Sequence, residues 1–234
     1  METKINFETY LFLSSRKIAI AVYDKSNLNN LYFKEVTNFD EKKNFDYEVV
    51  EDFLEKNVFE IEKKLKNFVK HINLILESVE FLTILISVKK GNYGKKILKD
   101  DLTYLLNEAK DECKETISDR RIIHMLIDNY LIDKKNYSSL PLDQRCNFFS
   151  LDIKFVCLSK NYIRDLEKIL KKYQISINNI IQADYVSSFQ KENQNDLFQM
   201  AMQLLEGYNK NEVLIVPKQS KNKGFFERFF NFFR

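Results

Sequence analysis

The stretch Asn147-Phe-Phe-Ser-Leu-Asp-Ile-Lys-Phe-Val-Cys-Leu158 decides the fold class. Apolar and polar side chains alternate along it in the order Phe149, Ser150, Leu151, Asp152, Ile153, Lys154, Phe155. A period of two residues predicts a strand with one buried face. Apolar residues then recur at helical spacing at Tyr162, Ile163, Leu166, Ile169, Leu170 and Tyr173, after a cap at Ser159 or Asn161. A strand followed directly by an amphipathic helix indicates a mixed α and β domain.

The segments on either side continue this mixture. Further strands are expected at Tyr10–Val22 with a break at Ser14–Lys17, and at Leu28–Thr37, Ile72–Leu76, Phe81–Val88, Arg121–Ile132 and Ile175–Ile181. The first two form a hairpin or meander. Helices are expected at Tyr47–Lys70, from a cap at Asp100 or Asp101 to Cys113, and from Leu197 to a stop near Gly207, while Gly91 and Gly94 mark a turn. The predicted fold class is α+β, with mixed β-sheets and packed helices.

Composition excludes several classes of protein. A chain of 234 residues with 44% hydrophobic residues is long enough to bury a core, as one large domain or two small ones. The net charge of +3 is too small to argue for nucleic acid as a partner. Three cysteines without close spacing predict buried or free thiols in a reducing cytoplasm. Because Glu77 and Glu80 interrupt the longest apolar run, we expect a soluble or peripheral protein.

Residues for catalysis are scarce. The two histidines, His71 and His124, lie in apolar stretches and are expected to be packed or surface residues. The cysteines have no spacing that suits zinc. With only four glycines, the chain contains no glycine-rich phosphate-binding motif. We therefore expect no enzymatic activity, no cofactor and no metal site.

Residues 224–234 carry the most specific functional signal. Their sequence is Gly-Phe-Phe-Glu-Arg-Phe-Phe-Asn-Phe-Phe-Arg, with phenylalanine pairs at 225/226, 229/230 and 232/233. At about 100° per residue, the six rings would cover an arc of roughly 160° on a helix. The membrane-binding residues are predicted to be Phe225, Phe226, Phe229, Phe230, Phe232, Phe233, Arg228 and Arg234, with Lys218, Lys221 and Lys223 in a basic tether after Pro217. The alternative is a terminal helix that packs on the core of its own domain.

The order of the elements resembles the first lobe of FtsA, the actin-like bacterial family that ties the cell-division ring to the inner membrane. The segments that carry the resemblance are 10–22, the long helix, Asn129–Asp133 with the loop to Leu140, Phe155–Ser159, Ile180–Ser188, Phe198–Gly207 and the closing phenylalanine helix. In the family, Phe155–Ser159 and Ile180–Ser188 would be a strand and the closing strand of an inserted subdomain. The resemblance implies a degenerate half of an actin-like fold plus this subdomain and a C-terminal amphipathic helix.

The chain departs from the family at the residues that bind nucleotide. Where the family has an acidic residue and then Gly-Thr-x-Lys, this chain has Phe12, Ser14, Ser15 and Lys17, so that Lys17 is at best a relic of a phosphate site. About ten residues between Ser188 and Phe198 stand where the family has its second lobe. That lobe carries the docking site for the tubulin-like FtsZ, so direct FtsZ binding is not implied.

These observations predict five segments and one function. The segments are a partial actin-like lobe (1–80), an inserted α+β subdomain (81–182), a closing helix and strand (183–216), the tether (217–223) and the membrane helix (224–234). The expected function is that of a non-enzymatic, FtsA-like adaptor in cell division, on the cytoplasmic face of the inner membrane at the division site. Its expected partners are anionic lipid and division proteins, with self-association left open and no nucleic acid.

Two other functions stay open at this point. One is an adaptor of an envelope machine such as the type IV pilus, whose protein PilM has the same actin-like plan and binds a peptide of a membrane partner. The other is residual nucleotide binding through Lys17.

Overall fold

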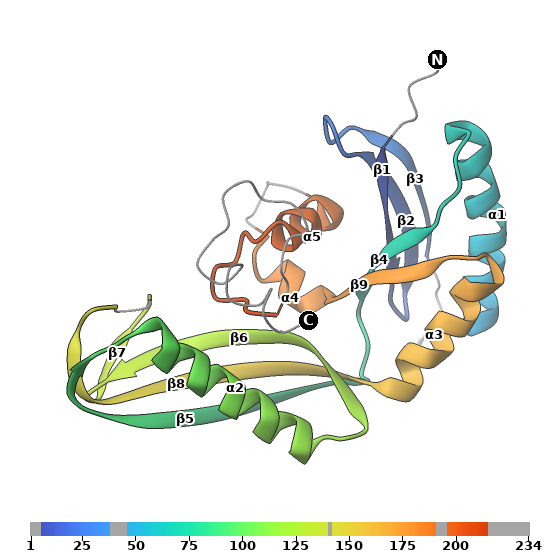
Figure 1. The fold of residues 1–234 in the computed structure, drawn as a ribbon. Helices are drawn as coiled ribbons and strands as arrows, with labels where there is room; N and C mark the ends of the chain where they lie inside the picture. Colours follow the sequence, from blue (N-terminus) through green and yellow to red (C-terminus); the bar gives the residue numbers. More distant parts are fainter. Residues whose placement is uncertain (1–5, 38–45, 140–141, 191–195, 215–234) are drawn as a thin grey trace. The chain divides into compact units, whose positions relative to one another are not determined.

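The computed structural model describes residues 6–37, 46–139, 142–190 and 196–214, which form two compact units. The first unit contains residues 1–81 and 160–202, and the second contains residues 82–159 and 203–234. Figure 1 shows one sheet in each unit. The α+β class expected from the sequence is confirmed.

The first unit is built on a mixed five-stranded sheet in the order β3-β2-β1-β4-β9. Its strands are β1 (Phe7–Leu13), β2 (Lys17–Asp24), β3 (Asn30–Thr37), β4 (His71–Leu76) and β9 (Ser176–Gln182). The first three form an antiparallel meander, whereas β4 runs parallel to both β1 and β9. The central strands read as continuous apolar runs, such as Ile18–Tyr23, because both faces of the sheet are covered.

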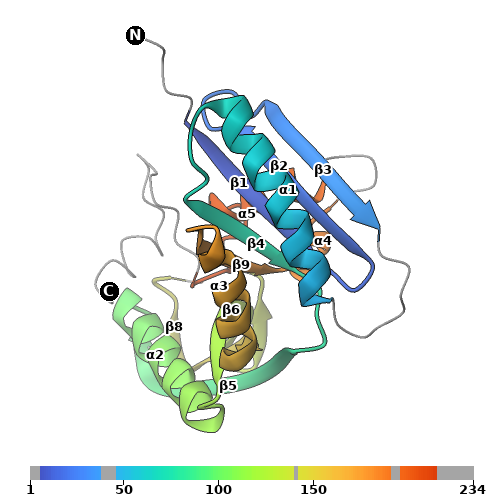
Figure 2. The ribbon, with the colours of Figure 1, turned by 90° about the vertical axis from the view of Figure 1, so that its right-hand side faces the viewer.

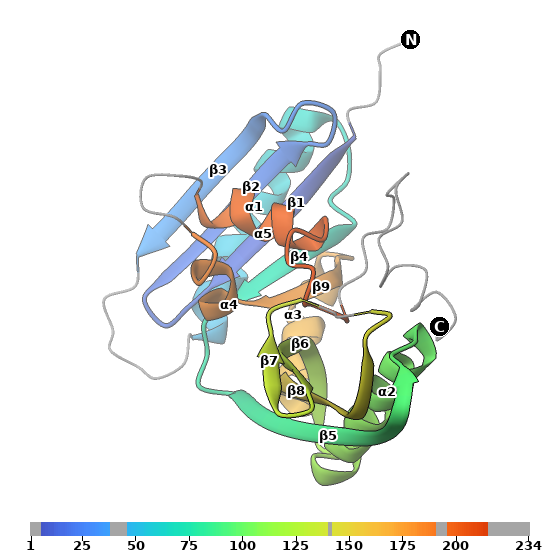
Figure 3. The ribbon, with the colours of Figure 1, turned by 90° about the vertical axis from the view of Figure 1, so that its left-hand side faces the viewer.

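Helices α1 (Tyr47–Leu65) and α3 (Lys160–Lys172) cover one face of this sheet, as Figure 2 shows. Figure 3 views the other face, crossed by α5 (Leu197–Leu205), where the Phe198 ring packs edge-on against Phe33 of β3. Helix α1 begins at Asp46, whose carboxylate accepts a hydrogen bond from the Glu48 N–H. It ends earlier than the expected Lys70 because Lys66 adopts a left-handed conformation with φ of 50°.

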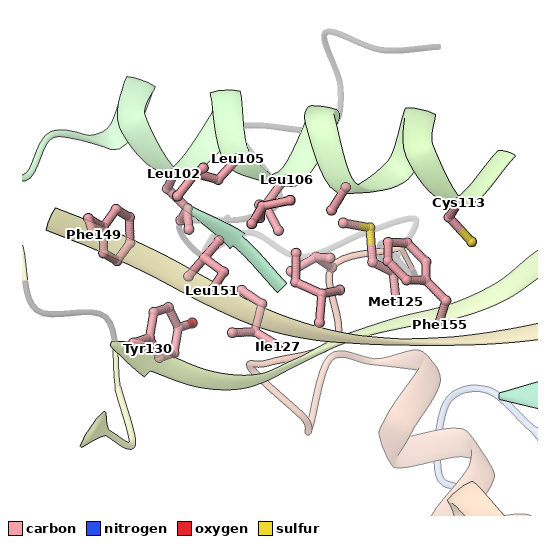
Figure 4. Packing of buried hydrophobic residues seen from close by; sticks show 14 of the residues in the cluster. Leu102, Leu105, Leu106, Cys113, Met125, Ile127, Tyr130, Phe149, Leu151 and Phe155 are labelled. Atoms are coloured by element: carbon pink, nitrogen blue, oxygen red, sulfur yellow. The ribbon is translucent and has the colours of Figure 1, made fainter. Parts of the chain in front are cut away.

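The second unit is a four-stranded sheet in the order β5-β8-β6-β7, with helix α2 (Lys99–Thr116) packed on one face. The strands are β5 (Phe81–Lys96), β6 (Arg120–Ile132), β7 (Lys135–Tyr137) and β8 (Arg145–Ser159). Figure 4 shows the core between them, where Leu102, Leu105, Leu106 and Cys113 of α2 meet the strands. The expected inner face of this helix and the expected strand at 147–158 are confirmed.

The structure corrects three local expectations. Gly91 and Gly94 lie inside β5 instead of in a turn, and the Arg145 side chain of β8 donates a hydrogen bond to the Gly94 carbonyl. The N-cap of α2 is Leu98, and Asp101 accepts from its N–H three residues later. Residues 183–187, expected in a closing strand, form the short helix α4 (Ala183–Ser187), with Ala183 and Val186 buried.

The place of β9 differs from the expected subdomain of 81–182. Strand β9 pairs in parallel with β4, so α3 and β9 lie with the first unit, and the second unit keeps 82–159. Strand β6 and strand β8 instead pair with each other along their length, which closes the second unit's sheet without β9.

Candidate functional site

The residues predicted to bind the membrane, from Lys218 to Arg234, lie outside the described residues. Among the described residues, no helix is long and apolar enough to cross a membrane. The part of the chain that the structure describes also holds no cluster of three or more potential metal ligands. What the structure does show is how the segment that leads to the tether is held, and which surfaces the second unit exposes.

Residues 209–214, which precede the tether in sequence, are fixed to the edge of β6. The Ile127 N–H donates to the Asn211 carbonyl and the Val213 N–H donates to the Met125 carbonyl, both at 2.9 Å. Leu126 and Glu212 form an isolated antiparallel bridge. The segment therefore adds a short extra strand to the second unit, and this addition sets the point from which residues 215 onward continue.

A buried carboxylate completes this attachment. Glu212 Oε1 accepts hydrogen bonds from the backbone N–H groups of Met125 (3.2 Å) and Leu214 (2.9 Å), and Oε2 lies 3.1 Å from His124 Nδ1. Both side chains are buried, with 0% exposure for His124 and 3% for Glu212. A buried carboxylate is tolerated when hydrogen bonds satisfy its oxygens. The role of Glu212 could not be predicted from the sequence, because nothing there distinguishes this glutamate from an ordinary surface acid.

The expectations for the histidines and cysteines are confirmed. His124 is packed, and His71 is exposed at the start of β4, with Nδ1 2.7 Å from the Ser176 hydroxyl. All three cysteines are buried free thiols. Burial raises the pKa of the Cys157 thiol to about 12, so this sulfur stays protonated and is a poor nucleophile at neutral pH.

Lys17, the predicted relic, lies at the start of β2 and forms an ion pair with Glu35 of β3. In the turn before it, Ser14 Oγ accepts from the Lys17 N–H at 2.9 Å and from the Arg16 N–H at 3.3 Å. Turns that bind phosphate use such backbone N–H groups as donors to the ligand. In this turn, both N–H groups and the Lys17 ammonium already have protein partners.

Part of the second unit's sheet face opposite α2 is exposed or half-exposed around Leu85 and Ser87, whereas His124 and Val156 farther along this face are buried. A polar network crosses three strands there: Asp152 of β8 accepts from the Ser87 hydroxyl of β5 at 2.6 Å and from the Asn129 amide of β6 at 3.3 Å. Apolar groups flank it, since Leu85 is 70% exposed and the half-exposed Phe148 ring lies under the Lys89 ammonium at 4.2 Å. A rigid surface with exposed apolar and aromatic groups and basic side chains is suited to binding another macromolecule.

Comparison with known proteins supports the fold. No protein-family model matches the chain, and no curated protein matches it in sequence. Among solved structures, it matches the PilM–PilN type IV pilus biogenesis complex with a TM-score of 0.50 and 7% identity, over 85% of this chain and 51% of that one.

Two further structures match with lower scores. The cytoplasmic domain of EpsL, an inner membrane component of the Vibrio cholerae type II secretion system, has a TM-score of 0.37 and 15% identity over 81% of this chain and 60% of that one. A Bacteroides thetaiotaomicron protein with an actin-like ATPase fold and unknown function has a TM-score of 0.32 and 16% identity over 80% of this chain and 56% of that one.

The chain spans between 51% and 60% of the length of these three structures. The similarity to the PilM–PilN complex supports the α+β fold of this chain. The actin-like arrangement expected from the sequence stays a prediction. The finer resemblance to FtsA rests on the sequence segments alone.

Proposed function

We propose that the protein is a non-enzymatic adaptor, held at the cytoplasmic face of a bacterial inner membrane by residues 217–234, that presents its second unit to protein partners. The observation that carries the proposal is the pattern of residues 224–234, which separates six phenylalanines from the charged residues. The docking of residues 209–214 on β6 supports it, because a firm attachment before the tether transmits anchoring to the folded units.

The expected affinity for the membrane is modest. Full burial would stabilise the bound state by roughly 1.5–3 kcal/mol for each ring, but burial in the interface is partial. Ordering the helix costs about 1–2 kcal/mol for each backbone residue. Each lysine or arginine adds about 1 kcal/mol on an anionic leaflet. Binding by one tail should therefore be reversible and sensitive to salt, and durable attachment requires several tails on one assembly.

Flotation with vesicles tests the anchor. The full chain should float with vesicles that contain anionic lipid at low salt, and Phe229→Asp should remove most of that binding. Phe59→Asp is the matched control, because Phe59 is an exposed phenylalanine of α1, 68% exposed, outside the proposed anchor. Equal flotation of the Phe229→Asp variant and the unchanged chain would show that residues 224–234 do not bind lipid.

Within this role, we place the protein in cell division, as an FtsA-like adaptor at the division site. The support is the order of its segments together with the phenylalanine-rich residues 224–234, which resemble the membrane-targeting end of the FtsA family. The proposal does not include FtsZ binding, since the chain has no counterpart of the lobe that docks it. A fluorescent fusion at midcell would support a role in division.

A second candidate is a PilM-like adaptor of an envelope machine, which would bind a peptide of a membrane partner. The similarity to the PilM–PilN complex favours it. The phenylalanine-rich residues 224–234 favour the division role, because such an end is part of the resemblance to FtsA. Polar foci of the same fusion would support the pilus-like role, and a diffuse signal would argue against both.

A further inference from the structure

Strand β5 forms an edge of the second unit's sheet, with β8 as its neighbour in the order β5-β8-β6-β7. The first part of β5, from Phe81 to Val88, is apolar except for two small hydroxyl residues. A long apolar edge strand offers a row of backbone hydrogen-bonding groups to another strand, and proteins usually blunt such edges. Here no charged residue or proline blunts the edge between Phe81 and Val88, and the Leu85 side chain beside it is 70% exposed.

The sequence around Leu85 reads nearly the same in both directions. Pairs at equal distance from Leu85 are Ile84 and Ile86, Thr83 and Ser87, Leu82 and Val88, Phe81 and Lys89, and Glu80 and Lys90. The three inner pairs join residues of the same chemical type. The outer two join an aromatic ring to a cation and an acid to a base. A segment with this symmetry is complementary to an antiparallel copy of itself, as an isologous contact requires.

Contacts on both faces of the sheet order the segment Phe81–Val88 before any partner binds. Ile84 and Ile86 pack against the core under α2, and Ser87 on the opposite face is bonded to Asp152 of β8. The strand is thus fixed from both faces, and its ordering costs little when a partner binds. The flat part ends shortly after Lys90, because Tyr93 and Gly94 have φ of 50° and 74° and interrupt the regular strand.

We propose that two copies of the chain pair through β5, antiparallel and related by a twofold axis at Leu85, so that two four-stranded sheets become one of eight strands. In this register Leu85 faces Leu85 of the second copy and Phe81 faces Lys89. Lys90, whose ammonium is paired with Asp101 of its own chain, stands opposite Glu80, so no like charges meet. A slip of two residues, with Ile86 at the axis, places Lys90 opposite Leu82 and loses this complementarity. The proposal does not depend on membrane binding.

Cross-linking of single-cysteine variants tests the register. The native thiols are buried, so a cysteine at position 85 is the reactive thiol in the described chain. Under mild oxidation with diamide, Leu85→Cys should form a disulfide dimer, because directly opposed Cβ atoms lie about 4.5–5.5 Å apart. Thr83→Cys is the matched control: position 83 faces position 87 of the second copy, which leaves the two new thiols about 13 Å apart.

A mixture of Thr83→Cys and Ser87→Cys chains should again cross-link, as a heterodimer. Dimer formation that is equal for Leu85→Cys and Thr83→Cys would overturn the proposed register.

Sedimentation equilibrium without lipid tests the dimer itself. The chain should dimerise, and Leu85→Lys should raise the dissociation constant at least tenfold, since it places two cations at the axis. Phe59→Lys, which changes an exposed apolar residue of the first unit, should leave it unchanged. A monomer across the accessible concentrations, or a dimer insensitive to Leu85→Lys, would overturn the proposal. Neither result would decide whether residues 224–234 bind lipid, which the Phe229→Asp flotation tests separately.

Discussion

At the scale of single residues, Lys17, which the resemblance to FtsA places at a former phosphate site, forms a structural ion pair. Its ammonium pairs with Glu35 across two strands, and both partners are about two-fifths exposed. Exposed ion pairs contribute about 0–1 kcal/mol. Lys17→Ala should therefore change the urea midpoint little, and titration with fluorescent ATP should detect no binding in either protein. Saturable binding that Lys17→Ala abolishes would instead support a working nucleotide site.

Tyr23 ties the start of α5 to β2 and makes stability depend on pH. Its hydroxyl donates to Asp196 Oδ2 at 3.0 Å, and Asp196 Oδ1 accepts from the Gln199 N–H in the first turn of α5. Burial, assisted by the nearby Asp196 charge and opposed by a hydrogen bond from Asn30, raises the pKa of Tyr23 to about 12. Because the folded-state pKa lies above the unfolded value of about 10, this contribution is complete below pH 10 and is lost as the pH rises through 12.

The measurement is urea unfolding between pH 8 and pH 11.5. The unchanged chain should lose stability over this range, and Tyr23→Phe should lose less, because the group that titrates has been removed. At pH 8 the variant should be about 1 kcal/mol less stable, the usual contribution of a hydrogen bond. Identical slopes for the two proteins would mean that Tyr23 does not contribute to the pH dependence.

Glu212 is the residue on which the attachment of the tether depends. Glu212→Ala would leave His124 Nδ1 and the N–H groups of Met125 and Leu214 without their buried acceptor. The expected loss is about 1–3 kcal/mol for each buried donor left without an acceptor. Hydrogen exchange should show faster exchange at Val213 and Ile127. Glu206→Ala, at an exposed position directly after α5, should change neither quantity.

At the scale of elements, the start of α2 combines a cap with an ion pair. Burial alone would raise the pKa of Asp101, but the Lys90 ammonium at 2.6 Å and the Leu98 N–H outweigh it and lower this pKa. The contribution is therefore present above the unfolded pKa of about 3.9 and is lost as the pH falls through the lower folded value. Asp101→Asn should destabilise the chain by about 1 kcal/mol at pH 7 and by less near pH 3, measured by urea unfolding. If the loss of stability in Asp101→Asn does not change with pH, the Lys90–Asp101 ion pair does not contribute to stability.

Elements whose apolar residues repeat with a clear period were predictable from sequence. The alternation along 147–158 and the stripe of Leu102, Leu105 and Leu106 each have one periodicity, and both elements formed as expected. The ends of elements were less predictable, because they depend on contacts that are distant in sequence. The Gly94 carbonyl near the end of β5 accepts a hydrogen bond from Arg145, fifty-one residues away, and no local pattern contains that information.

The attachment of residues 209–214 was hidden for the same reason. Glu212 and His124 are separated by 88 residues, and each alone resembles an ordinary surface acid or a packed histidine. The pairing of β9 with β4 likewise joins segments about a hundred residues apart. Sequence periodicity predicts which face of an element is buried, whereas the element that buries it is decided by the packing of the whole unit.

At the scale of the whole molecule, the β5 pairing and the tail both affect the affinity of the protein for the membrane. A dimer would bring two tails to one membrane, and once the first is bound, the second binds at an effective concentration in the millimolar range. Two weak anchors can then bind about 10²–10⁴ times more tightly than one. Loss of the dimer should therefore weaken membrane binding although the tail is unchanged.

Sedimentation with anionic vesicles at several salt concentrations measures this coupling. Leu85→Lys should need at least tenfold more lipid for half-maximal binding than the unchanged chain, whereas Phe59→Lys should bind as the unchanged chain does. Leu85→Lys adds a positive charge, which by itself would strengthen binding to anionic lipid, so a weaker interaction cannot come from charge. The difference in half-maximal lipid concentration between Leu85→Lys and the unchanged chain should narrow when the unchanged chain is diluted below its dimer dissociation constant. If Leu85→Lys binds vesicles as well as the unchanged dimer does, a single tail is sufficient and the pairing of β5 has no part in membrane attachment.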